Sequence, residues 1–245
     1  MQHKVEVMRI SFHWLLALLA APLAVAATAA GQDAGPDYPV LLKPLGLTVP
    51  HECRHLIPRD ATALVALRVD EEGRVVDWVG LDLPHPALFK AIGRALAHAR
   101  FSPALWDGEP VPVDCHAYIR VGEAALGVLS VNMAEHIESR MVEVAPDLNR
   151  VVLSQARQLD QPLRLLSEGT PVRVIDDDGV PLSGSVAVEF YVDQEGRPRM
   201  IRTAEGPHPA LREATIMTVE GFRFEPPRSH GRPTVVKARI TLEFS

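Results

Sequence analysis

The chain carries one pattern of residues twice, and no other feature restricts its fold as strongly. Residues 69–74 (VDEEGR) align with residues 192–197 (VDQEGR), an offset of 123 positions. The same offset aligns three further motifs without a gap: PHPAL at residues 84–88 and 207–211, RFxP at residues 100–103 and 223–226, and GxP at residues 108–110 and 231–233. Solenoid repeats are roughly 20–50 residues long, so this longer period predicts duplication of a whole small domain.

Each copy is predicted to fold as strand, turn, strand, helix and strand. Residues 186–192 have the two-residue alternation of a half-buried strand. The D-x-E-G sequence that follows suits a hairpin loop closed by glycine. A helix is predicted to begin at Pro86 and at Pro209, because proline is favoured at the first helical position. The preceding His85 and His208 are then expected to serve the start of each helix.

These elements define an α+β fold with two copies of a small β-β-α-β antiparallel-sheet module joined by a helical connector. The predicted boundaries are residues 36–122, 123–169 and 170–245. Pro146 divides the connector into two expected helices, whose apolar stripes have helical spacing. The stripe residues are Met133, Ile137, Met141 and Val144, then Leu148, Val151, Val152 and Gln155. Two roles stay open for this segment: packing on both modules, or binding a partner.

Residues 1–30 have the layout of a secretory signal peptide. Arg9 supplies the positive charge, residues 15–19 the apolar centre and residues 24–26 (AVA) a cleavage site. The rival interpretation is a retained membrane anchor. An alanine-rich run that Pro22 interrupts is marginal, however, against the ~20 strongly apolar residues of a membrane span. The chain is therefore expected to be exported.

Charge and motif content narrow the classes of function. The formal net charge of −6 offers no basic field for phosphates, so nucleic acid is not expected as a partner. There is neither a G-x-S-x-G nucleophile elbow nor a phosphate-binding glycine loop, and no residue is predicted to be catalytic. His51, Cys53 and His55 match no established zinc spacing. The sequence thus predicts a protein that is not an enzyme and has no cofactor or metal site.

The two cysteines of the chain are Cys53 and Cys115. In an exported protein such a pair is most often a disulfide, and this bridge is predicted here. The strand of Cys115 is expected to neighbour the first strand of its module, which Cys53 shortly precedes, so the bridge is geometrically reasonable. The alternative is that the thiols are buried and free.

With these motifs assigned, the repeated module resembles the C-terminal domain of the TonB family, a periplasmic domain of the TonB/TolA type. The second copy has the G-x-V-x-V strand from Gly184, the V-D-x-x-G turn from Val192, RFxP, GxP, and a closing strand that ends in Leu242-Glu243-Phe244. The first copy has most of this pattern. The resemblance implies an α+β domain that lies in the periplasm.

The resemblance also implies a mode of binding, in which an extended peptide of a protein partner adds as a strand beside the last strand of the domain. The residues expected to receive it are Val236, Lys237, Ala238, Arg239, Ile240, Thr241 and Leu242. Residues 113–121 are the second candidate. Alternatively, these edges pair with each other, between the copies or across a homodimer.

The expected function is that of an exported periplasmic protein-binding or scaffold protein with tandem TonB-like modules. The resemblance links it to outer-membrane transport, with an outer-membrane transporter as the expected partner. The alternative is a TonB-type energy transducer anchored in the inner membrane. That reading fits less well, because Ser11 and His13 have the wrong spacing for the family's membrane helix and a long proline-rich spacer is absent.

Overall fold

The computed structural model describes residues 38–58, 61–121, 128–132, 150–168, 174–175, 179–204, 206 and 208–244. The predicted signal peptide, residues 1–30, and the first predicted connector helix, from Met133 to Val144, lie outside this description. Within the described ranges, no helix is long and apolar enough to cross a membrane.

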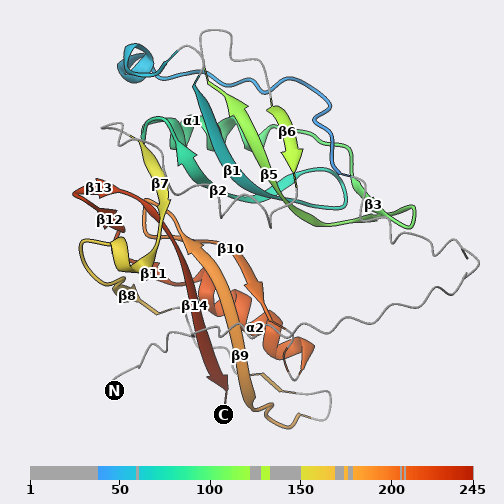
Figure 1. Ribbon diagram of the computed structural model, residues 1–245. Helices are drawn as coiled ribbons and strands as arrows, with labels where there is room; N and C mark the ends of the chain where they lie inside the picture. Colours follow the sequence, from blue (N-terminus) through green and yellow to red (C-terminus); the bar gives the residue numbers. More distant parts are fainter. Residues whose placement is uncertain are drawn as a thin grey trace, which may run out of the picture. The chain divides into compact units, whose positions relative to one another are not determined.

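The fold is a mixed α+β arrangement rich in sheet, which confirms the predicted class (Figure 1). The first half contains η1 (His51–Leu56), β1 (Thr62–Val69), β2 (Val75–Leu83), α1 (Leu88–Ala97), β3 (Ala104–Trp106), β4 (Glu109–Val111) and β5 (Val113–Arg120). The second half contains β9 (Gly184–Val192), β10 (Pro198–Thr203), α2 (Pro209–Glu220), β11 (Arg223–Phe224), β12 (Arg228–Ser229), β13 (Arg232–Pro233) and β14 (Val235–Phe244). Between the halves lie β6 (Val128–Asn132), β7 (Val151–Ser154), η3 (Ala156–Gln158) and β8 (Leu165–Ser167).

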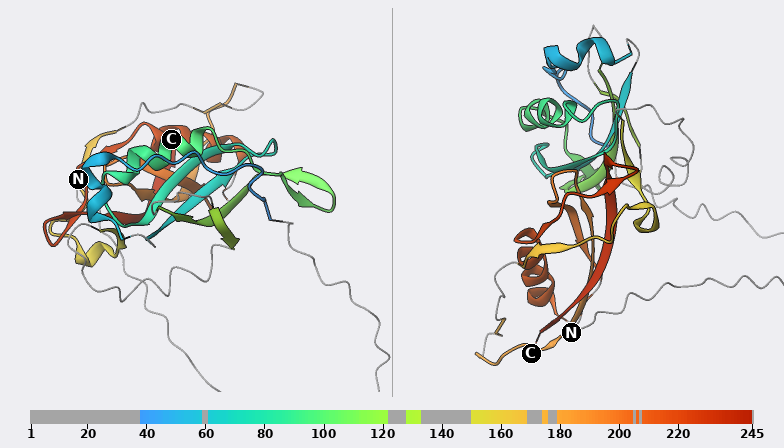
Figure 2. Two further views of the ribbon diagram at one scale, coloured as in Figure 1. Left: turned by 90° about the horizontal axis from the view of Figure 1, so that it is seen from above. Right: turned by 90° about the vertical axis from the view of Figure 1, so that its left-hand side faces the viewer.

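Eight strands share one sheet in the order β10-β9-β14-β7-β2-β1-β5-β6. The three strands that belong to each half are antiparallel, with the first strand in the middle. Val69 lies opposite Val113 in the first half, and Val192 lies opposite Val236 in the second. These four residues are also matched by the sequence offset, so the two ladders have the same register. Helix α1 packs against strands of the first half and α2 against strands of the second (Figure 2).

Two apolar clusters form the core, one made mainly of first-half residues and one of second-half residues. In the second half Val188 and Phe190 of β9 pack with Val219 and Phe222, while the ring of Phe224 lies 5.7 Å from that of Phe190. The inward side chains of β1, such as Val65 and Leu67, are fully buried in the larger cluster of the first half. The strict alternation along β9 is what directs its apolar side chains to the helix-covered face.

The expected role of the two histidines at the helix starts is confirmed. Nδ1 of His208 accepts the N–H of Ala210, and Nδ1 of His85 accepts the N–H of Ala87, each at 3.2 Å. These bonds satisfy backbone donors that have no partner within a helix. Helix α2 begins at its proline as predicted, whereas α1 begins at Leu88, two residues after its proline.

The second predicted connector helix is wrong. Val151 and Val152, which were expected on a helical stripe, belong to β7. β7 pairs antiparallel with β2 and parallel with β14, so its backbone is bonded to neighbouring strands. A short apolar run does not distinguish helix from strand by spacing, and two consecutive β-branched residues favour the strand.

The predicted disulfide is not formed, and both cysteines are free and buried. Cys53 lies in η1, where its thiol donates to the carbonyl of Pro50 at 3.4 Å. Cys115 lies opposite Leu67 in the middle of the sheet, and burial raises the pKa of its thiol to about 12. Each sulfur is therefore accommodated within the first core as a small apolar group.

Two glycines at matching positions hold the hairpin turns against the RFxP segments. Gly73 and Gly196 have φ angles of 74° and 79°. A Cβ atom at Gly196 would lie 2.0 Å from the carbonyl oxygen of Phe224, and one at Gly73 would lie 2.0 Å from that of Phe101. Both the backbone conformation and the space therefore require glycine.

We expect Gly196→Ala to lower the free energy of unfolding by about 2–4 kcal/mol, because it adds left-handed strain and a clash with rigid backbone. Gly231→Ala is the matched control, since Gly231 has a φ of 74° and open space around it. It should cost only about 1 kcal/mol. Urea unfolding of both variants measures the difference, and equal losses would show that the close approach to Phe224 is unimportant.

Candidate functional site

The predicted binding residues lie on β14, the closing strand of the second half. β14 pairs with β9 along its length, from Val236 opposite Val192 to Phe244 opposite Gly184. Figure 1 shows the two strands side by side and antiparallel, with β14 ending at the C-terminus. On the other side β7 pairs with β14 only at Val235 and Val236. Among the described residues no strand pairs with that side of β14 from Ala238 onward.

The side chains of β14 alternate between two environments. Ala238, Ile240 and Leu242 are half-buried and pack against the core under α2. Arg239 and Thr241 are exposed on the opposite face. A strand added beside this segment would therefore meet apolar side chains on one face and polar ones on the other.

The carboxylate of Glu189 on β9 balances the basic side chains of this strand. Its oxygens lie 3.7 Å from Nζ of Lys237 and 3.7 Å from Nη1 of Arg239. Nζ of Lys237 also lies 6.0 Å from the ring centroid of Tyr191. One carboxylate thus lies close to two cations of β14.

The direction of the β14 backbone groups follows from the shared register. In the first half the N–H of Val121 donates to the carbonyl of Ala61 at 2.9 Å, so every second pair from there is hydrogen-bonded. The ladder of β14 and β9 has the same register, so Ile240 belongs to a hydrogen-bonded pair. The N–H groups of Arg239 and Thr241 then point away from β9, toward the side where a strand can add.

The corresponding edge of the first half is covered. The second candidate, residues 113–121, contains β5, which pairs with β1 on one side and with β6 on the other. His116, Ala117, Tyr118 and Ile119 all lie opposite residues of β6. β5 is therefore an inner strand of the sheet, and the second candidate edge is wrong.

The outer edge of β10 is occupied by side chains of the first half. A bulge between Arg199 and Arg202 places Met200 at a φ of 52°. The N–H of Met200 donates to Oδ2 of Asp77 on β2, and Nη2 of Arg68 on β1 donates to the carbonyl of Ile201 at 3.0 Å. Bulges and covering groups of this kind keep an edge strand from pairing with another chain.

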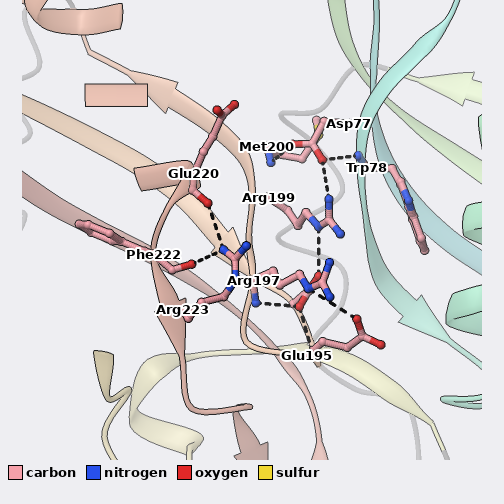
Figure 3. A network of polar contacts seen from close by, with 10 residues as sticks. Asp77, Trp78, Glu195, Arg197, Arg199, Met200, Glu220, Phe222 and Arg223 are labelled. Carbon is pink, nitrogen blue, oxygen red and sulfur yellow. Dashed lines mark hydrogen bonds and ion pairs between the residues drawn. The ribbon is translucent and has the colours of Figure 1, made fainter. Parts of the chain in front are cut away.

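Asp77 is also the first member of a chain of ion pairs (Figure 3). Nη1 of Arg199 lies 3.5 Å from Oδ1 of Asp77, and Nε of Arg199 lies 3.1 Å from Oδ2 of Asp193. Asp193 is fully buried, and its other oxygen accepts the N–H groups of Glu195 and Arg197 at 2.9 Å each. The hairpin turn of the second half is thereby tied to β2.

Asp114 on β5 forms a second ionic connection between the halves. Its two oxygens accept from Nε of Arg68 at 2.8 Å and from Nε of Arg202 at 2.6 Å. Burial raises the pKa of Asp114, but the hydrogen bonds and positive charges of Arg68 and Arg202 outweigh it, so the pKa lies below its ordinary value. The folded state therefore favours the ionised carboxylate.

Sequence reasoning did not find these connecting residues. Arg68, Asp77 and Asp114 lie in strands whose periodicity describes only burial within one copy. A weak signal was present in the repeat itself, because Asp77 and Asp114 stand where the second copy has Met200 and Lys237. Acidic residues that only one copy of the repeat has are compatible with contacts between the copies. The sequence offset does not identify the residues that they contact.

We expect Asp114→Asn to reduce the free energy of unfolding at pH 7 by about 1–2 kcal/mol, because the charge-assisted bonds to Arg68 and Arg202 are weakened at a partly exposed site. A carboxylate with a lowered pKa contributes its stability above the unfolded-state value of about 3.9 and loses it as pH falls through the folded-state pKa. The difference between wild type and variant should therefore shrink below about pH 4. Urea unfolding at pH 7, 5, 4 and 3 measures it, and a constant difference would contradict this origin.

Residues 181–245 match the family model described as the Gram-negative bacterial TonB protein C-terminal domain. No curated protein matches the chain at a significant level. Domains of this family are periplasmic and interact with outer-membrane transporters, which is consistent with a protein partner. The matched residues include all of β9, α2 and β14, so the similarity to the TonB C-terminal domain covers the whole strand-helix-strand body of the second half.

Proposed function

We propose that the protein is an exported periplasmic protein-binding or scaffold protein, not an enzyme, whose β14 edge receives a partner peptide as an added strand. The observation that carries this proposal is the contrast between edges. β5 is paired on both sides, β10 is covered by Asp77 and Arg68, and β14 from Ala238 onward pairs with β9 alone among the described residues. The segment predicted to receive the peptide, Val236 to Leu242, is shortened at its start, because Val236 also pairs with β7.

The first half is, on this proposal, a diverged second copy of the TonB-type module. Support comes from the sequence offset, the same strand order in each half and the same register between first and last strand. The glycines at Gly73 and Gly196 also make the same close approach to an RFxP segment. The first copy supports the second through Arg68, Asp77 and Asp114, and is not itself the peptide-binding copy.

The partner class follows from the family match. A peptide of an outer-membrane transporter, in extended conformation, would donate and accept backbone hydrogen bonds along β14. Its side chains would alternate between the half-buried row of Ala238, Ile240 and Leu242 and the exposed row that contains Arg239. Main-chain bonds would supply affinity and these two rows would supply selectivity.

Arg239→Pro tests this edge, because proline removes an N–H that points away from β9 and leaves the bonds to β9 in place. In a pull-down from outer-membrane extract, we expect the variant to capture at least tenfold less outer-membrane transporter than wild type. Arg239→Ala is the matched control, since it removes the same side chain and keeps the N–H.

Capture that is unchanged by Arg239→Pro would contradict strand addition at β14. Sedimentation of the same variants addresses the competing homodimer. A wild-type dimer that Arg239→Pro converts to a monomer, with no transporter captured by either, would show that the edge serves a second copy of the chain.

The two hypotheses, a scaffold protein and an anchored energy transducer, differ in whether residues 1–30 are cleaved. On the proposed function, mass spectrometry of the protein isolated from the periplasm should give an N-terminus at Ala27, after the AVA motif of residues 24–26, or at Ala30, after the similar ATA motif of residues 27–29. Retention of the apolar run from Trp14 to Ala30 in a membrane fraction would favour the transducer.

A further inference from the structure

A groove lies between the segment that precedes β1 and the helix α1. It encloses about 720 Å³, within the range of small-molecule sites. One wall is formed by residues 43–46 and Thr48, and the other by α1 and the residues that follow it up to Arg100. The groove belongs to the first half and is separate from the β14 edge.

The lining is basic. Four of the lining residues are Lys43, Arg94, His98 and Arg100, and among the described residues that line the groove none is acidic. Lys43, Arg94 and His98 form no ion pair with any described residue, and Arg100 donates through Nη1 to the carbonyl of Ala99 at 2.7 Å. The net charge of the chain is −6, so this cluster of basic side chains is a local exception. Such a cluster favours an anionic ligand.

The wall opposite α1 is fixed in place by backbone bonds. The N–H of Leu42 donates to the carbonyl of Arg100 at 2.9 Å, and the N–H of Ser102 donates to the carbonyl of Val40 at 2.8 Å. Leu45 is almost fully buried in the first core. The backbone segments that carry the basic side chains are therefore fixed relative to each other before any ligand arrives.

The floor is made of small residues, with Gly46, Ala91, Ala95 and Ala99 among the lining. Small side chains leave room for a compact ligand between the basic residues. The other half does not reproduce this arrangement, because α2 has Met217 and its C-cap Gly221 at the positions that match Arg94 and His98. The basic groove is thus specific to the first half.

We propose that this groove binds a small phosphate-bearing molecule. A phosphate group carries close to two negative charges near neutral pH and several acceptor oxygens, and it suits both the fork of Arg94 and the point charge of Lys43. A carboxylate carries a single negative charge, so it is expected to bind less tightly than a phosphate group among these basic side chains. A soluble phosphate compound and a lipid headgroup share this chemistry.

Isothermal titration calorimetry of the purified full chain distinguishes these sources. The probes are pyrophosphate, dihexanoyl phosphatidic acid below its critical micelle concentration, and acetate. We expect saturable binding of at least one phosphate probe and binding of acetate at least tenfold weaker. The tighter of the two phosphate probes identifies the source. Acetate binding as tight as either phosphate probe would overturn the assignment to phosphate.

The site is tested by Arg94→Gln, with Lys90→Gln as the matched control. Lys90 is an exposed cation on the same helix that does not line the groove. Arg94→Gln should weaken phosphate binding about tenfold and Lys90→Gln less than twofold. Circular dichroism confirms that both variants fold. An equal loss in the two variants would place the binding elsewhere. No saturable binding by wild type would show that these cations serve only the C-terminal end of α1.

Discussion

One short strand, β7, joins the two halves of the sheet, and its length determines where the edge of β14 begins. β7 pairs with β2 through Val151 and Val152 and with β14 through Leu153 and Ser154. At this junction the hydroxyl of Thr234 donates to the carbonyl of Val152 at 2.6 Å and lies 2.6 Å from the hydroxyl of Ser154, in a buried site. These bonds satisfy polar groups that burial would otherwise leave without partners. Because β7 ends at Ser154, its pairing with β14 stops at Val236, and this is where the β14 edge begins.

Edge strands carry unpaired backbone groups, and the sides of β10, β5 and β14 that face away from their own modules differ in how these groups are covered. β10 is bulged, and its N–H and carbonyl are bonded by an aspartate and an arginine from the other half. β5 is covered by β6. On β14 the corresponding groups beyond Val236 meet no described strand. The difference between β10 and β14 is informative, because covering the backbone of β10 requires charged residues at defined positions of the first half. In the part of the chain that the structure describes, no other strand pairs with β14 beyond Val236 except β9, which supports the proposal that a partner strand adds there.

The sequence predicted the elements whose signals are local and failed where contacts are distant. Alternation along β9 and β14, glycine at Gly196 and the histidine before α2 all describe interactions within one module, and the structure contains them. Helical spacing misassigned β7, because four residues with two valines are too few to separate a helix from a strand whose partners lie in both halves. The pairing of Cys53 with Cys115 was inferred from compartment and neighbouring strands, yet each thiol occupies its own place in the core. The ionic connections of Asp77 and Asp114 depend on how the modules meet, which no periodicity encodes.

The closing strands of the two halves have the same register on their neighbours but different surroundings in the sheet. The register of β5 on β1 equals that of β14 on β9, so each closing strand directs the same alternate N–H groups away from its module. In the first half those groups face β6, and pairing there makes β5 an inner strand. The family match covers residues 181–245, the half in which the described residues leave this side of the closing strand without a partner strand beyond Val236. Where a protein has two like modules, the closing strand of one can be paired within the protein while that of the other is left to pair with a partner. Asp77 and Asp114 of the first half form ionic contacts with the second half. The matching positions of the second half hold Met200 and Lys237, so the sequence differs between the halves at the residues that connect them.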